Sequence, residues 1–293
     1  MTTTATEPTT KTLEVPGAML TYDVREAPGT TEPPLFLIGS PMGASGFPTL
    51  ASHFPDRTVI TYDPRSIERS TAKDPSQPIT TEVQADDVHR IIEAIGGPVD
   101  MFASSGGAIV SLALVAKHPD DIRTLVAHEP PLASLVPDRE HALAVNRAMH
   151  ETYKARGGAW GMAHFMQVVM HPGPFTADDV TAPPPDPANF GMPGDDDGKR
   201  DDLMLAHNVL YLTSYEPDFA AIKRSPTRIV IGVGAASNGE LAQRGGEAAA
   251  ERLGTQAVAF PGTHGGFLGN EYGQPGEPEA FATKLREVLA RKD

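Results

Sequence analysis

The spacing of apolar residues changes repeatedly along the chain, and each change marks a predicted element. Continuous apolar runs of four or five residues are typical of strands buried on both faces of a parallel sheet. They alternate with stretches in which apolar residues recur three and four positions apart, as on one face of a helix. The predicted strands are 13–15, 19–24, 35–38, 58–62, 99–103 and 124–128, and the predicted helices are 80–95 and 108–118. This alternation predicts a doubly wound α/β fold with a mostly parallel sheet, entered through an antiparallel pair at the N-terminal end.

The alternation stops after about residue 131 and resumes near residue 224. The stretch between has helical patches separated by Pro- and Gly-rich segments, which we interpret as a helical cap inserted at one edge of the sheet. Residues 13–131 and 224–293 then form one α/β core, and 132–223 form the cap. Residues 1–12 are Thr-rich without a basic start or an apolar core, so we expect a flexible leader and not a signal peptide. Beyond the cap the predicted elements are strand 228–233, helix 239–253, strand 257–260 and a helix closing near residue 289.

Composition removes several classes of function. The 293-residue chain has a formal net charge of −14, which disfavours nucleic-acid binding because phosphate contacts need a basic surface. We find no apolar run long enough for a membrane-spanning helix and expect no membrane partner. Cysteine is absent, which excludes disulfides and thiolate metal sites and fits a reducing, cytoplasmic compartment. A small-molecule substrate is the expected partner.

A predicted strand leads directly into a helix through a turn rich in Ser and Gly. A nucleophile at the apex of such a turn sits in strained backbone, so the residues two before and two after it must be small. With Ser105 at the apex, these neighbours are Ala103 and Gly107. Ser104 at the apex would put Phe102 in the crowded position. Ser105 is therefore the predicted nucleophile, although a structural or phosphate-binding turn has a similar composition.

A short loop containing Gly and Pro follows an earlier predicted strand, and by itself it is compatible with an ordinary strand-end turn. Gly39-Ser40-Pro41 directly follows the predicted strand 35–38. Together with the turn at Ser105, it resembles the α/β-hydrolase family, which has a His-Gly-x-Pro-like loop here, with Ile38 in place of the His. The resemblance implies that the backbone N–H groups of Ser40 and Gly106 form the oxyanion hole.

Residues 62–70 resemble another segment of the same family, Asp-x-Arg-Gly-x-Gly-x-Ser. Ser66 and Glu68 replace both of its glycines. Because this segment is architectural in the family, we assign it no catalytic function. The resemblance covers nearly the whole chain after residue 12, and the cap is its least recognisable part.

The family resemblance places the general base on a loop after the last strand, near the C-terminal end. His264 lies in such a loop, which is rich in glycine and could let the imidazole reach Ser105. No other of the ten histidines has this placement. His264 is the predicted base of a serine–histidine–acid triad.

The acid of the triad has two candidate positions. Its commonest place in the family is after the strand ending at Val233, but no carboxylate stands there, and Glu240 is expected simply to start the next helix, near the positive end of its dipole. Some family members instead carry the acid at the end of the strand after the nucleophile helix, where this chain has Glu129. A carboxylate at the buried mouth of a sheet needs a partner. We predict that Glu129 orients His264, with the position after Val233 left open.

Other motifs do not indicate metal or cofactor chemistry. His128-Glu129 is followed by two prolines and is not the helical pair of a zinc protease. Asp195-Asp196-Asp197 lacks the alternating ligands of a calcium loop. No phosphate loop or dinucleotide fingerprint is recognisable, so we expect neither a metal nor a cofactor.

The sequence therefore predicts a serine hydrolase that cleaves an ester, lactone or thioester through an acyl-enzyme. Two alternatives stay open: the same triad used for carbon–carbon cleavage, lyase, cyclase or perhydrolase chemistry, and a non-catalytic ligand-binding member of the fold. Met and aromatic residues of the cap either pack it onto the core or line an apolar pocket, which favours an apolar or aromatic acyl substrate. They are Met149, Trp160, Met162, Phe165, Met166, Met170, Phe175, Phe190, Met192, Met204, Tyr211 and Tyr215.

Overall fold

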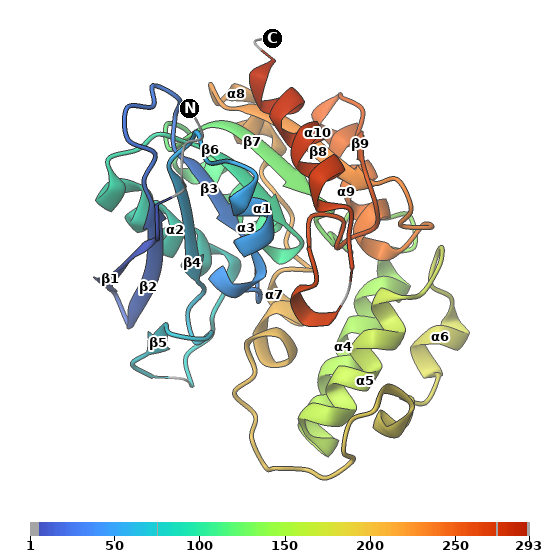
Figure 1. Cartoon of the computed structure of the whole chain (residues 1–293). Coiled ribbons are helices and arrows are strands. Elements are labelled where there is room, and N and C mark those ends of the chain that lie inside the picture. The colour runs from blue at the N-terminus through green and yellow to red at the C-terminus, as the bar shows by residue number, and fades with distance from the viewer. Residues whose placement is uncertain (1–5, 75, 274, 292–293) are drawn as a thin grey trace.

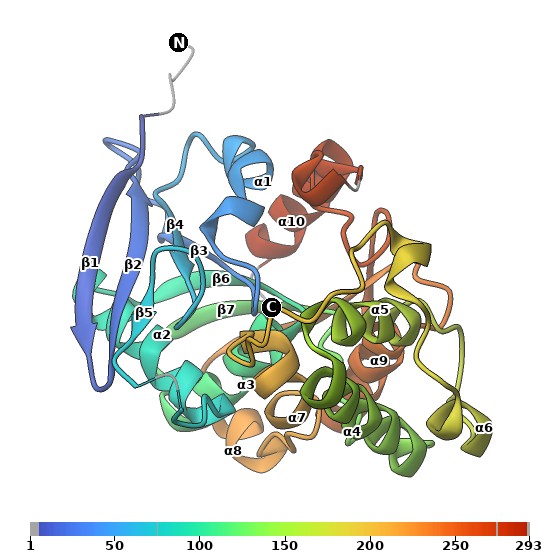
Figure 2. The same cartoon turned by 90° about the horizontal axis from the view of Figure 1, so that it is seen from below.

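The computed structural model describes residues 6–74, 76–273 and 275–291, which form a mostly parallel sheet between two layers of helices (Figures 1 and 2). The strand order is β1-β2-β4-β3-β6-β7-β8-β9, and the short β5 pairs with β2. The strands are β1 (Thr9–Val15), β2 (Ala18–Arg25), β3 (Leu35–Ile38), β4 (Val59–Asp63), β5 (Thr71–Ala72), β6 (Val99–Ser104), β7 (Ile122–His128), β8 (Arg228–Gly234) and β9 (Val258–Phe260). The predicted fold class is confirmed.

The two faces of the sheet are covered by different helices, as Figure 2 shows. One face packs against α2 (Thr81–Ile95), α3 (Gly106–Lys117) and α9 (Leu241–Leu253). The other face packs against α1 (Pro48–Ser52) and α10 (Pro278–Ala290). From β4 to β9 along the sheet order, each strand runs parallel to the next, so their carboxyl ends meet at one edge of the sheet, whereas β2 pairs antiparallel with β1, β4 and β5. In folds of this type that edge is where ligands bind.

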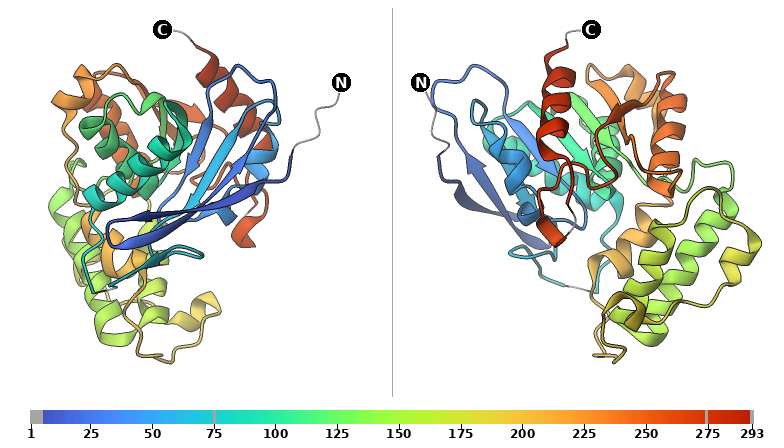
Figure 3. Two further views of the ribbon diagram at one scale, coloured as in Figure 1. Left: turned by 90° about the vertical axis from the view of Figure 1, so that its left-hand side faces the viewer. Right: turned by 45° about the vertical axis from the view of Figure 1, so that its right-hand side comes forward.

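The N-terminal hairpin is longer than the sequence predicts. β1 begins at Thr9, so residues 9–12 of the expected leader belong to a strand paired with β2 (Figure 3). Its outward-facing residues are polar and exposed, and no apolar alternation signals the strand. The hydroxyl of Thr10 donates to the carboxylate of Asp23 at 2.6 Å, which ties the two strands together on this side. Residues 1–5 of the predicted leader lie outside the described residues.

The helical insertion follows β7 and lies on one side of the sheet (Figures 1 and 3). It contains α4 (Arg139–Arg156), α5 (Gly158–Val169), α6 (Ala177–Thr181), a π-helical turn (Met204–Asn208) and α7 (Val209–Tyr211). Met149, Tyr153, Leu205 and Val209 form a small apolar cluster within this cap. None of the described helices is both long and apolar enough to cross a membrane.

The end of the predicted cap belongs to the core by its packing. The helix α8 (Phe219–Arg224) falls inside the predicted range 132–223, except for its last residue. However, Phe219 and Ile222 are buried in the apolar cluster between the sheet and α2 and α3. Leu212 joins the same cluster. The residues that pack as a separate cap therefore end before residue 212.

Candidate active site

Ser105 occupies the turn between β6 and α3. Its backbone has φ 57° and ψ −127°, a conformation that costs energy in a residue with a side chain and that persists only when the surrounding structure holds it. The backbone N–H of Ser105 donates to the carbonyl of His128 at 3.0 Å. Ser104, the alternative, is buried as the last residue of β6. The strained turn thus presents Ser105 at the carboxyl edge of the sheet.

Two glycines let the loop after β3 pack against this turn. A Cβ on Gly106 would lie 2.4 Å from the carbonyl oxygen of Ser40, and a Cβ on Gly107 would lie 2.8 Å from the Cα of Gly39. Neither backbone could move away without disturbing the sheet. The close approach explains why small residues must follow Ser105, and it brings together the two backbone segments that the sequence predicts for an oxyanion hole.

The N–H groups of Ser40 and Gly106 are both available for a ligand. Gly106 is the first residue of α3, where a helical N–H has no partner within the helix and carries part of the positive end of the dipole. Among the residues that the structure describes, neither Ser40 nor Gly106 donates its backbone N–H to another protein group.

His264 and Glu129 are in direct contact. The imidazole Nδ1 of His264 lies 2.7 Å from Oε2 of Glu129. The other carboxylate oxygen, Oε1, accepts the backbone N–H of Gly234 at 2.8 Å. Glu129 is fully buried, whereas the His264 side chain is 37% exposed. The carboxylate therefore fixes Nδ1 of the imidazole, and Nε2 has no hydrogen-bond partner among the residues that the structure describes.

The environment of Glu129 keeps its carboxylate charged. Burial works to raise the pKa of Glu129, but the hydrogen bond and the charge interaction with His264 outweigh it and lower the pKa to about 2. The residue directly follows β7 and has a φ of 48°, in the left-handed region that residues with side chains avoid. Its N–H donates to the carbonyl of Gly232 at 2.9 Å, which holds this conformation.

The strand end after Val233 supplies a donor and no acid. Gly234, the last residue of β8, gives its N–H to Glu129, as described above. Glu240 directly precedes α9, as expected, and burial raises the pKa of its carboxyl. In the described part of the chain Glu240 makes no hydrogen bond with His264. Glu129 is the carboxylate that contacts the imidazole.

Ser105 and His264 make no direct hydrogen bond within the described residues. The two are linked through β7, because the carbonyl of His128 accepts from Ser105 and the next residue, Glu129, holds His264. In ligand-free active sites the nucleophile–base contact is commonly long and tightens when substrate binds. The fold thus brings His264 and Glu129 into contact and places Ser105 on the neighbouring strand end, bonded to the residue before Glu129.

In the segment after β4, two residues with side chains adopt backbone conformations that usually need glycine. Ser66 and Glu68 have φ values of 65° and 47°, so both replaced glycine positions keep left-handed backbone. The segment is held by polar contacts, including Arg69 to Asp63 at 2.6 Å. Its contacts are structural, as the sequence predicts.

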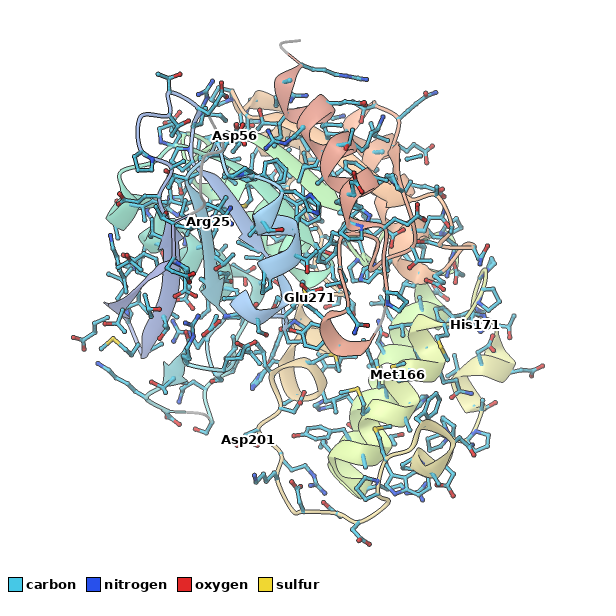
Figure 4. All side chains as sticks on the ribbon, in the orientation of Figure 1. Arg25, Asp56, Met166, His171, Asp201 and Glu271 are labelled. Atoms are coloured by element: carbon cyan, nitrogen blue, oxygen red, sulfur yellow. The ribbon has the colours of Figure 1, made fainter. Side chains whose placement is uncertain are left out.

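The loop that carries His264 is fixed at its far side. Glu271, labelled in Figure 4, accepts the backbone N–H groups of Thr49 at 3.1 Å and Gly269 at 2.5 Å. Thr49 lies in α1, which packs beside α10. This arrangement anchors the His264 loop to the helix layer formed by α1 and α10.

One cluster of metal-ligand types lies away from this edge. His89, His118 and Asp121 place ligand atoms within 4.8 Å of one another, near the amino end of β7. The two imidazoles are stacked with ring centroids 3.6 Å apart and 12° between their planes. An ion in the plane of one ring would lie well outside the plane of the other. Nδ1 of His89 already lies 2.7 Å from a carboxylate oxygen of Asp121, so a hydrogen bond between these two residues and the stacking of His118 on His89 account for the cluster.

Comparison with known proteins identifies the family. The family described as the alpha/beta hydrolase fold matches residues 35–203. The chain belongs to the α/β-hydrolase fold family. A Bacillus subtilis protein named uncharacterized hydrolase YraK is 29% identical over 287 residues, which cover 96% of each chain. The predicted family is confirmed, and with it the expectation that the chain is an α/β-hydrolase enzyme.

Solved structures of this family share the fold. An esterase from Thermogutta terrifontis has a TM-score of 0.65 at 19% identity, covering 97% of this chain and 98% of that one. An enol-lactonase from Burkholderia xenovorans has a TM-score of 0.64 at 20% identity, covering 96% of this chain and all of that one. The resemblance covers nearly the whole length of this α/β hydrolase.

Two polar residues that the structure places beside Ser40 are not among those identified from the sequence. Gln84 and Asn208 are buried, and both hydrogen-bond the Ser40 hydroxyl. Gln84 has a detectable signal, because it stands four residues before Val88 on the apolar stripe of the predicted helix, where a polar residue is unexpected. Asn208 has none, since the cap shows no regular apolar period around it.

Proposed function

We propose that this α/β hydrolase is a serine hydrolase that cleaves an ester, lactone or thioester through an acyl-enzyme. The observation that carries the proposal is the contact of His264 with the buried carboxylate of Glu129 next to the strained turn at Ser105. A buried carboxylate, an imidazole and a serine at one sheet edge are the three parts of a catalytic triad.

In the proposed reaction the Ser105 hydroxyl attacks the carbonyl carbon of the substrate, and Nε2 of His264 takes the hydroxyl proton. The tetrahedral oxyanion is held by the N–H groups of Ser40 and Gly106, each strong donor of this kind contributing roughly 3–4 kcal/mol to lowering the barrier. As the carbonyl re-forms, the bond to the leaving oxygen or sulfur breaks, and His264 gives its proton to the leaving group. A water molecule, activated by the same imidazole, then releases the acid and frees Ser105.

Glu129 has a defined part in these steps. As the acceptor of Nδ1–H, it keeps Nε2 unprotonated and ready to accept the Ser105 proton. Its lowered pKa keeps the carboxylate charged, which stabilises the imidazolium that forms during attack. The lack of a carboxylate directly after Val233 favours a non-catalytic protein, and the contact of the Glu129 carboxylate with His264 weakens that argument.

The substrate is proposed to be small and carbonyl-containing. The names of the structural relatives, an esterase and an enol-lactonase, support an ester or lactone bond. Several cap residues considered for an apolar pocket instead fill the cap itself, because Met149 is buried in the cap's apolar cluster and Phe165 and Met204 pack against it. Preference for an apolar acyl group therefore rests on the remaining Met and aromatic residues of the cap.

Fluorophosphonate labelling followed by peptide mass spectrometry tests the proposal. Wild type should gain one adduct on Ser105, which Ser105→Ala abolishes and His264→Ala and Glu129→Gln slow strongly. Ser104→Ala is the matched control, because it removes the neighbouring hydroxyl and leaves the adduct in place. No adduct on folded wild type would disprove the proposal. An adduct on Ser105 without turnover of simple esters, lactones or thioesters would instead favour carbon–carbon cleavage or lyase chemistry.

A further inference from the structure

The side chain of Ser40 belongs to a closed ring of three buried hydrogen bonds. Its Oγ–H donates to Oε1 of Gln84 at 2.6 Å, and Nε2 of Gln84 donates to Oδ1 of Asn208 at 2.9 Å. Nδ2 of Asn208 completes the ring by donating to Oγ of Ser40 at 2.9 Å. The three residues are 3%, 1% and 4% exposed, in the order Ser40, Gln84, Asn208. Each member donates once and accepts once within the ring.

The ring joins three separate parts of the molecule. Ser40 lies in the loop after β3, Gln84 lies in the first turns of α2, and Asn208 ends the π-helical turn of the insertion. Such π-helical turns are frequent at functional sites. Nearby, the hydroxyl of Thr81 donates to the carbonyl of Tyr211 at 3.0 Å, which is a second link between α2 and the insertion.

Backbone packing against Gly106 and Gly107 places the loop at Ser40, and the hydrogen bonds of the Ser40 hydroxyl add an anchor at the side chain. The peptide plane before Ser40 follows Gly39, and because glycine has wide intrinsic freedom, the orientation of that plane depends on these contacts. That plane carries the Ser40 N–H, whose direction decides whether it can reach an oxyanion beside Gly106. The Ser40 hydroxyl is hydrogen-bonded to the side-chain amides of Gln84 and Asn208. These bonds limit the movement of Ser40 through its side chain. Apolar side chains could fill the same volume without the desolvation cost of polar groups, so packing alone does not call for the ring.

We propose that Gln84 and Asn208 are positioning residues that hold the Ser40 N–H in the geometry of the oxyanion hole, which makes a residue of the cap part of the catalytic apparatus of the core. The proposal rests on the proposed function, because it assigns Ser40 to the oxyanion hole. It goes beyond that function by naming what orients the donor.

Kinetics of Gln84→Met and Asn208→Leu, which keep volume and remove the polar groups, test the positioning function. A donor held out of place weakens transition-state binding more than substrate binding, so kcat on a chromogenic ester should fall roughly 10- to 100-fold with KM changed by less than about threefold. The rate of Ser105 labelling by the fluorophosphonate should fall in parallel. The kcat of the double variant should lie within about twofold of the kcat of the slower single variant, because the first substitution already opens the ring.

Thr81→Val is the matched control. It removes a hydrogen bond between α2 and the insertion at a buried position without touching Ser40, and kcat should stay within about twofold of wild type. Circular dichroism and melting temperature show that each variant is folded. Gln84→Ala and Asn208→Ala replace any apolar variant that does not fold, with the same kinetic expectation.

The outcomes separate the two proposals. Labelling of wild-type Ser105 that proceeds at the same rate in both ring variants would overturn the positioning function alone. Loss of kcat in the ring variants matched by an equal loss in Thr81→Val would also overturn it, since cap docking would then explain the effect. Absence of any adduct on wild type would overturn the proposed function and the positioning function together.

Discussion

The carboxyl ends of β7 and β8 are neighbours in the sheet, yet they contribute different groups to the candidate site. β7 is followed by Glu129, whose side chain contacts His264. β8 ends in Gly234, which offers only its backbone N–H, and that N–H binds the Glu129 carboxylate. The strand end where the family resemblance first places the acid thus holds a donor here, and the neighbouring strand is followed by the carboxylate that contacts His264.

The difference shows that in this protein a carboxylate that follows β7 reaches both the end of β8 and His264. Paired parallel strands lie about 4.8 Å apart, a distance that one extended side chain spans. Glu129 spans it, because one carboxylate oxygen reaches the end of β8 while the other meets His264. The left-handed backbone at Glu129 is the cost of starting from β7.

The largest expected effect breaks the comparison at β7. Glu129→Gln keeps the shape and removes the charge, and its amide favours the wrong imidazole tautomer, so kcat/KM for ester hydrolysis should fall roughly 10³- to 10⁴-fold. Glu240→Gln is the control on the β8 side and should change kcat/KM less than about threefold. Steady-state kinetics on both variants decide the matter. A larger loss in Glu240→Gln would assign the acid to the β8 side after all.

A second experiment moves the acid to the other strand. Ser237 is buried in the loop after β8, and a Cβ on Gly234 would lie 2.5 Å from the Ser237 Oγ. A carboxylate at position 237 would therefore lie close to Gly234, whose N–H binds Glu129. Glu129→Ala combined with Ser237→Asp should recover about tenfold in kcat/KM over Glu129→Ala alone, because even an imperfectly placed carboxylate favours the correct tautomer. The combination with Ser237→Asn is the control and should recover nothing. Equal activity of the two double variants would show that the strand ends are not interchangeable.

Gly234→Ala sharpens the comparison at the β8 end. The added Cβ would lie 2.8 Å from the carbonyl carbon of Thr263 and 3.0 Å from the carbonyl oxygen of Gly262, both in the loop that carries His264. We expect a loss of about 1–3 kcal/mol in the free energy of unfolding, and a lower kcat, because the loop must shift. Chemical denaturation measures the first effect. Gly158→Ala, where the Cβ meets no atom within 4 Å, is the control and should leave both values near wild type.

The smallest effect at neutral pH concerns His128, the last residue of β7. Its ring is fully buried among Phe102, Phe260 and Phe281, and neither ring nitrogen has a partner among the described residues. Burial lowers the pKa of His128 from 6.5 to about 4, with His264 adding to the effect and Glu129 opposing it. The folded protein therefore loses stability as pH falls from 6.5 towards 4, where the unfolded chain takes up a proton that the buried ring refuses.

His128→Phe should remove this loss. At pH 8 the variant should gain about 1 kcal/mol or less, since an apolar ring replaces unpartnered nitrogens of similar size. At pH 5 the gain should be about 2 kcal/mol larger, because the unfolded wild type is then protonated at this position. Denaturation of both proteins at the two pH values measures the difference. A gain independent of pH would mean that His128 titrates normally in the folded state.

Much of the fold follows from local pattern. The apolar run at Leu35 to Ile38 matches β3, and the helix expected from about Thr80 to Ile95 is α2, because buried parallel strands and one-sided helices leave regular signatures. Residues 9–12 of β1 and the helix α8 escape prediction for different reasons. The first is polar and exposed, and the second is short and packs on the core from within a stretch with no regular period.

Sequence by itself determined the candidates for the site. A serine flanked by small residues between a strand and a helix, a histidine in a late glycine-rich loop and a glutamate directly after a strand can each be recognised without coordinates, because the chemistry needs those residue types at those junctions. What sequence could not decide was the choice between the two strand ends, since both lie at the same edge. The tertiary structure decided which carboxylate touches His264.

Only the tertiary structure revealed the ring of Ser40, Gln84 and Asn208. The members are separated by 44 and 124 positions along the chain and come from three elements. Local sequence patterns report which face of an element is buried, but they carry no information about which distant polar groups will meet there. A buried amide finds its partner only when the sheet, the helix and the cap are packed together, so the polar network of the site is a property of the folded chain.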